Sequence, residues 1–281
     1  MARGEGLHSA VGPGAARLGP LRLPAPAWNR ATVGVASILV GLLLWEGIAR
    51  QFMTQRFLFA PPSLVLETLG QLFLGQQSPA GNSIYWHIYV SMSEFFLGFA
   101  LAAVVGIGLG VLVALCRPVD WALDPWIAAL YATPTVALAP LFIMWFGVDL
   151  GSKVAVVFLV ASIPILINTQ MGIHTADPRL VEAVRSFGAN RLQQIRIVLL
   201  PAALPAVVAG MRMAVGRGLV AIVVGELFGA RAGLGFLIYE SNNRFDTATL
   251  FAVVMILAVL GVLFVRLLDW LQARAMPWRG T

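Results

Sequence analysis

The sequence predicts an all-α, polytopic membrane protein with six transmembrane helices. The chain is 59% hydrophobic and only 11% charged, and its mean hydropathy is +0.85. Several windows of about 20 residues hold one charge or none, which is long enough for a helix to cross a hydrocarbon core. Only helices or a closed barrel pair all their backbone groups within lipid. The apolar runs are far longer than the alternating strands of a barrel, so helices are predicted.

The first 30 residues differ in composition from the rest of the chain. They are rich in Gly, Pro and Arg and contain no apolar core. We expect residues 1–30 to form a flexible cytoplasmic tail and not a cleaved signal peptide, which needs an apolar central region. Residues 31–281 are expected to form one transmembrane domain, because no internal repeat divides them.

Six apolar segments of this domain are long enough to cross a bilayer as helices. They lie near residues 31–49, 88–115, 124–146, 154–174, 203–227 and 248–268. Between the first two, the sequence FAPPSLVLETLGQLFLG begins with a pair of prolines and continues as a short, mostly apolar helix. This segment is too short to cross, so we expect it to lie at the outer interface.

Small residues recur at every fourth position in the second and fifth predicted spans. The stripes are Gly98, Ala102, Gly106, Gly110 and Ala114 in the second span, and Ala206, Gly210, Ala214 and Gly218 in the fifth. Such stripes allow close helix packing. We expect packing within one subunit, with a subunit interface or a moving gate as the alternative.

The distribution of Lys and Arg predicts the orientation, because cytoplasmic loops carry an excess of these residues. With a cytoplasmic N-terminus, 12 basic residues lie inside and five lie outside. Inside are Arg3, Arg17, Arg22, Arg30, Arg117, Arg179, Arg185, Arg191, Arg196, Arg266, Arg274 and Arg279; outside are Arg50, Arg56, Lys153, Arg231 and Arg244. Both termini, and the loop between the fourth and fifth spans, are therefore predicted to be cytoplasmic.

That loop contains the charged segment EAVRSFGANRLQQIRIVLLP, residues 182–201. Apolar residues recur at helical spacing on both sides of Gly188, which predicts two short amphipathic helices. Glycine between them permits a sharp change of direction. Pro201 and Pro205 suit the start of the next span. The helices could lie on the membrane surface or dock in a groove of a partner protein.

The same segment resembles the cytoplasmic loop of ABC importer permeases. Glu182-Ala183, Gly188 six places after the glutamate, and Leu200-Pro201 match that loop, whereas Val184 and Val198 depart from it. The resemblance implies a coupling helix that inserts into a groove of a cytoplasmic ATPase subunit. The residues it implicates in coupling are Glu182, Ala183, Ser186, Phe187, Gly188, Ala189, Leu200 and Pro201.

Further segments resemble permeases of the nitrate, sulfonate and taurine type. They are residues 131–154, 167–173, 210–227 and 233–238, and the likeness extends from about residue 85 to the end. Glu94 departs from the basic residue expected there. The resemblance implies an inner-membrane permease that works as a homodimer with two ATP-binding subunits inside and a solute-binding protein outside.

Three charged residues, Arg212, Arg217 and Glu226, fall within the fifth predicted span. A charge near the bilayer centre costs about 2.5 to 3.5 kcal/mol on insertion scales, so these side chains should face protein or water. Arg212 and Arg217 point about 140° apart on a helix and cannot share one partner. A buried structural pair and a role in an anion path are both open for them. Glu226, near the outer end, is expected to contact a gate or loop.

Polar side chains near prolines are the other candidates for the translocation path. Thr133 and Thr135 flank Pro134, and Asn168 and Gln170 lie at the end of the fourth span. Such groups can also pair with backbone atoms that a proline leaves free. Both interpretations are open for these four residues.

Enzymatic and nucleic-acid functions find little support in the sequence. The segment GVDLGSKV, residues 147–154, differs from a phosphate-binding loop at Ser152 and Val154. The three histidines are isolated, and Cys116 is the single cysteine, so neither a metal site nor another cofactor is expected. ATP hydrolysis is therefore expected in another chain. The positive charge of +6 fits cytoplasmic loops better than nucleic-acid binding.

The combined prediction is the transmembrane subunit of a binding-protein-dependent importer. The first alternative is an ion-coupled secondary transporter or channel, for which inverted repeats and paired broken helices are typical. The second is a membrane scaffold whose loop recruits a partner. A sulfonate, nitrate or similar anion is the expected solute, although related permeases carry aromatic vitamins and their precursors.

Overall fold

This computed structural model describes residues 30–51, 59–75 and 78–276 of the chain. All regular elements in these residues are helices. The chain divides into two units, Met1–Leu44 and Trp45–Thr281. The first is described only as the start of α1 (Arg30–Gln51). The predicted tail, residues 1–30, lies outside the described residues except for Arg30, so the tail stays a prediction.

Five helical segments are long and apolar enough to cross a membrane. They are α1, α3 (Ile84–Leu115), α6 (Leu150–His174), the continuous run Arg191–Leu227 that contains α9 (Leu200–Leu227), and α11 (Thr247–Ala275). A sixth span results if the bent pair Arg117–Ala132 and Thr135–Phe146 is one crossing. The predicted all-α membrane fold is confirmed.

The bent pair begins with α4 (Arg117–Ala132) and ends with η2 (Thr135–Leu138) and α5 (Ala139–Phe146). The two parts meet at an angle of 88°. Thr133 is extended, with ψ 138°, because the ring of Pro134 disfavours helical backbone in the preceding residue. The third predicted span, near 124–146, is therefore a broken helix that starts earlier than expected.

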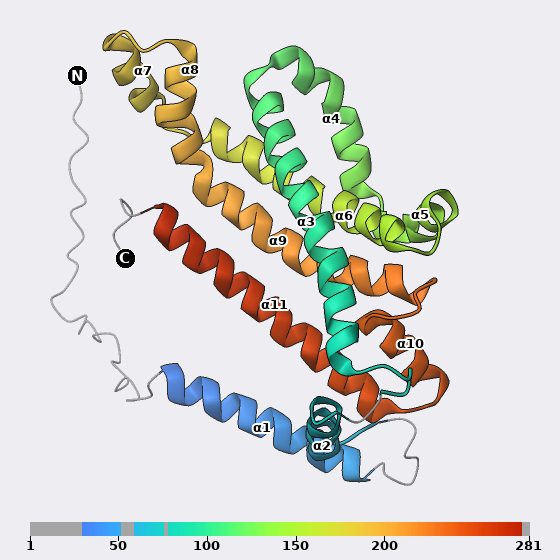
Figure 1. Cartoon of the computed structure of the whole chain (residues 1–281). Helices are drawn as coiled ribbons and strands as arrows, with labels where there is room; N and C mark the ends of the chain where they lie inside the picture. Colours follow the sequence, from blue (N-terminus) through green and yellow to red (C-terminus); the bar gives the residue numbers. More distant parts are fainter. Residues whose placement is uncertain (1–29, 52–58, 76–77, 277–281) are drawn as a thin grey trace, which may run out of the picture. The chain divides into compact units, whose positions relative to one another are not determined.

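Two short helices lie at one end of the second unit, opposite α7 (Pro178–Ser186) and α8 (Arg191–Gln194), as Figure 1 shows. One is α2 (Pro62–Phe73), predicted as a short helix. Its start is capped by Glu46, which accepts hydrogen bonds from the Ser63 amide at 3.0 Å and the Ser63 hydroxyl at 2.8 Å. The other is α10 (Leu234–Asn243), which was not predicted from the sequence.

The core of the second unit is built around α6. In its most apolar window 61% of the residues are buried, against 28% for α3 and for the run that contains α9. A Cβ on Gly110 would lie 2.6 Å from Thr169 Cβ, and one on Gly210 would lie 2.8 Å from Asn168 Cβ. Small residues thus let α3 and α9 approach α6 closely. Packing of the small-residue stripes within one chain, as predicted, is confirmed at these positions.

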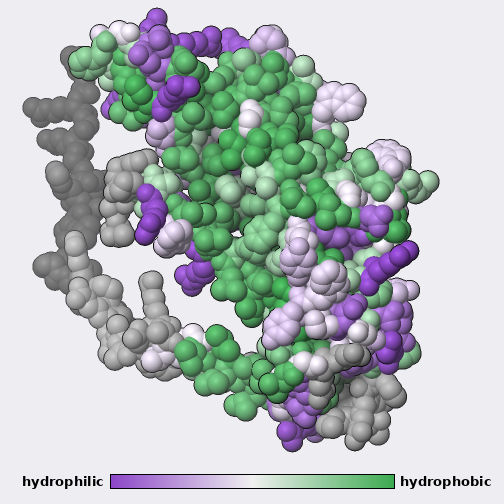
Figure 2. All heavy atoms as spheres, in the orientation of Figure 1, coloured by the Kyte–Doolittle hydropathy of each residue, from purple (hydrophilic) through white to green (hydrophobic). Residues whose placement is uncertain are grey.

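The surface of the second unit is hydrophobic over the middle of the long helices. Figure 2 shows hydrophilic side chains gathered around α7 and α8 at one end and around α2 and α10 at the other. Exposed apolar residues between the two ends include Leu101, Val104, Val259 and Leu263. Such a wide apolar band between polar ends is typical of a surface that faces lipid or other membrane helices.

Candidate functional site

The candidate coupling elbow, residues 177–201, is a helical hairpin that protrudes from one end of the second unit (Figure 1). Its first helix, α7, starts at Pro178, a residue that needs no hydrogen-bond acceptor for its nitrogen. The Asp177 carboxylate accepts a hydrogen bond from the Arg179 amide at 2.9 Å and caps this end. The beginning of the elbow is thus defined by local chemistry.

Gly188 ends α7 with a left-handed turn, φ +82°. The Gly188 amide donates to the Arg185 carbonyl at 2.9 Å, and the Ala189 amide donates to the Val184 carbonyl at 3.1 Å. These two bonds form a Schellman motif, which satisfies carbonyls at the helix end and favours glycine at the left-handed position. The predicted change of direction at Gly188 is confirmed.

The second half of the elbow begins with a capping box. The Asn190 side chain accepts from the Gln193 amide at 2.9 Å, and the Gln193 side chain accepts from the Asn190 amide at 2.8 Å. These reciprocal bonds satisfy two amides that a helix start would otherwise leave free. The turn between the two halves is therefore short and well bonded on both sides.

The prediction of a second short helix that is separate from the span near residues 203–227 is wrong. α8 continues through η3 (Ile195–Leu199), a π-helical turn, into α9 without a break. The Leu200 amide donates to the Ile195 carbonyl, five residues earlier. This wider turn accommodates Pro201, which cannot donate and whose ring would crowd the preceding helical turn. The elbow is continuous with a long membrane helix.

The tip of the elbow is exposed. Phe187 has 91% of its surface accessible, the highest value among the exposed large hydrophobic residues. The other predicted coupling residues divide by position: Glu182, Ala183, Ser186 and Gly188 are exposed, whereas Ala189, Leu200 and Pro201 are partly buried. An exposed aromatic side chain at the end of a protruding hairpin is typical of a contact with another protein.

Three of the predicted path residues lie together around the hollow at the break in the bent helix. Thr133, Thr135 and Arg217 line this hollow, whose volume is about 530 Å³. The guanidinium of Arg217 lies over the ring of Tyr131, 5.7 Å from its centroid. Tyr131 was not among the predicted path residues, although it stands two residues before Thr133.

The other predicted path residues lie elsewhere in the chain. The Asn168 amide donates to the Pro164 carbonyl at 2.8 Å, and Gln170 donates to Asp120 of α4 at 2.9 Å. Arg212 pairs with Asp269 of α11 at 2.6 Å and also donates to Gln272. As predicted, Arg212 and Arg217 have different partners.

Glu226 lies inside the second unit, with 1% of its surface accessible. Its carboxylate accepts hydrogen bonds from the Ser91 hydroxyl and from the Gly235 amide at the start of α10. Ser91 in turn accepts from the Leu234 amide at 2.7 Å. Glu226 was expected to contact a gate or loop, whereas its hydrogen-bond partners lie in two helices, so the carboxylate holds the first turn of α10 against α3 and α9.

A histidine extends this attachment of α10. The Gly233 amide donates to His87 Nδ1 at 3.1 Å. Nδ1 also lies 3.0 Å from the Gly233 carbonyl, and Nε2 lies 3.1 Å from the Ser78 hydroxyl, so the ring bridges Ser78 and the residue before α10. The histidines were predicted to be isolated, and the role of His87 was missed because its partners lie nine and 146 residues away in the chain.

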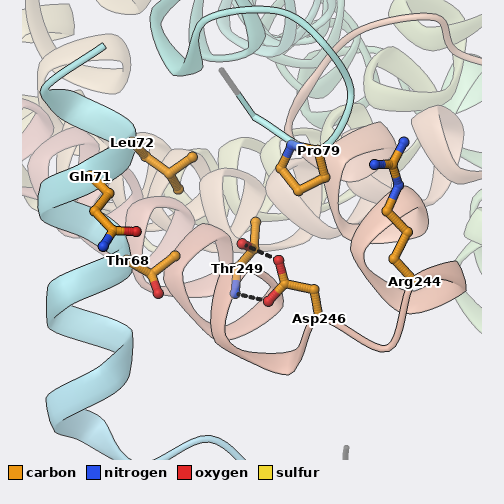
Figure 3. Close-up of a pocket in the computed structure, with 7 residues that line it drawn as sticks. All are labelled: Thr68, Gln71, Leu72, Pro79, Arg244, Asp246 and Thr249. Carbon is orange, nitrogen blue, oxygen red and sulfur yellow. Dashed lines mark hydrogen bonds between the residues drawn. The ribbon is translucent and has the colours of Figure 1, made fainter. Parts of the chain in front are cut away.

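A second hollow, of about 380 Å³, lies between α2 and the start of α11 (Figure 3). It is lined by Thr68, Gln71, Leu72, Pro79, Arg244, Asp246 and Thr249. Asp246 accepts from the Thr249 amide at 3.1 Å and from its hydroxyl at 2.6 Å, and so caps α11. This hollow includes none of the predicted site residues.

Comparison with known proteins yields consistent matches. Residues 106–277 match the family described as binding-protein-dependent transport system inner membrane component. The chain is 33% identical over 243 residues to a protein named putative aliphatic sulfonates transport permease protein SsuC of Bacillus subtilis, covering 85% of each chain. It is 29% identical over 255 residues to the taurine transport system permease protein TauC of Escherichia coli, covering 91% of this chain and 92% of the relative.

A solved structure shares the fold. The inward-facing MetNI methionine ABC transporter aligns with a TM-score of 0.57 and 21% identity, covering 69% of this chain and 95% of the matched one. At this level of identity the similarity shows a shared fold.

Proposed function

Because the chain belongs to the family of binding-protein-dependent transport system inner membrane components, and is a permease subunit of an ABC importer, we propose that it forms the path for a small anion. Sulfonates and nitrate are the first candidates, since relatives are named for transport of aliphatic sulfonates, taurine and nitrate. Arg217 lies beside a hollow and pairs with no carboxylate of the described residues, which agrees with an anionic solute.

The coupling elbow is the proposed contact with a separate ATP-hydrolysing subunit. Phe187 presents an apolar side chain to solvent, and exposed Glu182 and Arg185 lie on the same short helix. A hairpin of this size can insert into a groove of a partner, where the aromatic side chain supplies most of the binding free energy. The exposed tip at Phe187, within a segment that has the family's loop pattern, is the observation that carries this proposal.

Force from the ATPase would reach the membrane through α9. The helical run from Arg191 to Leu227 has no break, so a displacement of the elbow moves the helix that carries Arg217. Gly210 packs against α6, and the movement would therefore pass to α6 as well. ATP-driven closure of two ATPase subunits would then open the path outward, and hydrolysis would reopen it inward.

The proposed assembly contains two copies of this chain, two cytoplasmic ATP-binding subunits and an external solute-binding protein. The inner membrane is the proposed location, and the excess of basic residues in alternate loops favours cytoplasmic termini. The elbow would then face the cytoplasm, while α2 and α10 would face outward. ATP hydrolysis would take place on the partner subunits.

Removal of the apolar tip tests the proposed contact. We expect Phe187→Ala to weaken co-purification of the ATPase subunit at least tenfold, since a central aromatic contact contributes about 2 kcal/mol or more. Leu74→Ala is the matched control, because Leu74 is 88% exposed and directly follows α2, which lies at the opposite end of the second unit. Equal ATPase binding by both variants would contradict the proposal, provided that both reach the membrane in normal amounts.

A further inference from the structure

Arg217 is a charged residue deep within a membrane helix, and its side chain is exposed on the surface of this chain. It stands ten residues before the end of α9 at Leu227, about 15 Å along the helix axis, which is close to mid-bilayer depth. A guanidinium at this depth is strongly disfavoured against lipid. The side chain must therefore face water, a second protein chain or a bound ligand.

The other two charged side chains of α9 already have partners. Arg212 pairs with Asp269, and Glu226 accepts hydrogen bonds from Ser91 and Gly235. Arg217 has no such partner: among residues 30–51, 59–75 and 78–276, no carboxylate pairs with it, and its contact is the ring face of Tyr131. A ring face orients a guanidinium but leaves its N–H donors free.

The hollow beside Arg217 has the polarity of an organic anion site. Its volume of about 530 Å³ lies within the range of small-molecule pockets, about 300 to 1,000 Å³. The Thr133 hydroxyl donates to the Ala129 carbonyl at 2.8 Å, whereas the Thr135 hydroxyl has no partner in the described part of the chain. Val160 and Val220 provide apolar walls, and the lining contains no acidic residue.

The break in the bent helix is what opens this hollow. α4 ends at Ala132, and the chain turns by 88° before the next helical segment starts at Thr135, so the backbone at Thr133 and Pro134 belongs to no helix. Non-helical backbone at membrane depth is tolerated where it lines a cavity or is buried in protein. The cation, the free hydroxyl and the broken helix are three independent features that meet at one place.

We infer that this hollow binds an organic oxyanion with a short apolar tail. Arg217 binds the charged head, Thr135 donates a further hydrogen bond, and the tail packs against Val160 and Val220. This inference rests on the proposed transport function and names the solute class and the residues that contact it. The hollow opens on the surface of the chain, where the second copy of the proposed dimer would close it.

A cysteine at Thr135 provides a probe of the hollow that needs no knowledge of the natural solute. Cys116 is the single cysteine of the chain, so Cys116→Ser gives a clean background for Thr135→Cys. The complex of the permease with its ATPase subunits is placed in nanodiscs and treated with one of two thiol reagents. One reagent is the anionic sulfonatoethyl methanethiosulfonate and the other is the cationic trimethylammonium-ethyl methanethiosulfonate. The ratio of their rates of reaction with the cysteine reports the local electrostatic potential.

We expect Arg217→Gln to lower the ratio of the anionic reagent's rate to the cationic reagent's rate roughly fivefold, because the substitution removes about one unit charge at short range. Arg217→Lys, which keeps the charge, should preserve most of the ratio. Butanesulfonate at millimolar concentration should slow the reaction when Arg217 is present, whereas the neutral butanesulfonamide should not.

An unchanged rate ratio in Arg217→Gln would overturn the inference, as would equal protection by the two butane compounds or none by butanesulfonate. The protection experiment uses the arginine itself, so it decides the question even if Arg217→Gln fails to assemble. These outcomes leave ATPase binding untouched. Failure of the ATPase to bind the wild-type elbow would instead contradict the proposed function.

Discussion

Substitution of Gly188 is the most informative single perturbation of the elbow. At φ +82° a residue with a Cβ is disfavoured by about 1 to 2 kcal/mol relative to glycine. No steric overlap adds to this cost, because a Cβ at Gly188 would meet no atom within 4 Å. If docking requires the left-handed turn, Gly188→Ala should weaken ATPase binding by about 5- to 30-fold, at about 1.4 kcal/mol for each tenfold change.

Two further variants at the same position separate backbone conformation from side-chain size. Gly188→Asn should bind nearly as well as the wild type, because asparagine adopts left-handed backbone more readily than other residues. Gly188→Val should bind more weakly than Gly188→Ala, because its branched Cβ is poorly tolerated there. The assay is the dissociation constant of the purified ATPase subunit with the permease in nanodiscs. An order that follows side-chain volume, with Asn weaker than Ala, would refute the reasoning.

Two more predictions concern packing within the chain. Gly110→Ala places a Cβ 2.6 Å from Thr169 Cβ and should destabilise the protein by about 1 to 3 kcal/mol, which a lower Tm would show. Gly108→Ala is the control, because its Cβ on the same helix meets no atom within 4 Å and should leave the Tm unchanged. Equal Tm values for the two variants would contradict the close packing of α3 on α6. Glu226→Ala leaves the Ser91 hydroxyl and the Gly235 amide without their acceptor, so amide hydrogen exchange in α10 should become faster. Glu240→Ala is the control and should not change the exchange rate. Unchanged exchange in Glu226→Ala would show that other contacts hold α10.

The long helices could be predicted from the sequence because lipid imposes a simple requirement. Any apolar run of about 20 residues must satisfy its backbone internally, so the segments near residues 88–115 and 154–174 had one plausible structure. Gly188 was also predictable, because a glycine between two amphipathic patterns marks a turn whatever surrounds it. These inferences depend on neighbours in the sequence alone.

Features that depend on distant parts of the chain were missed. The helix α10 is only ten residues long, and its start is held by Ser91 and Glu226 from two other helices. The π-helical turn before Pro201 was missed because a proline after an amphipathic segment suggests a helix start as readily as a widened turn. Both cases need knowledge of the tertiary structure.

The candidate path was predicted in part. Arg217, Thr133 and Thr135 meet at one hollow, although 82 residues separate Thr135 from Arg217 in the sequence. The angle of about 140° between Arg212 and Arg217 on a helix separates the two side chains but does not determine which of them pairs with a carboxylate. Asp269, the partner of Arg212, lies in the last helix, and no local pattern links the two.

Site-specific crosslinking from the elbow tests most directly whether a soluble ATPase contacts the elbow and so transmits force into α9. Ala183→Cys is exposed at the elbow, and Leu74→Cys lies at the opposite end of the second unit, each in the Cys116→Ser background. We predict that Ala183→Cys forms a crosslink to the ATPase subunit whose yield changes with ATP, and that Leu74→Cys forms none. A crosslink to the ATPase from Leu74→Cys but not from Ala183→Cys would contradict both the proposed contact and the proposed orientation.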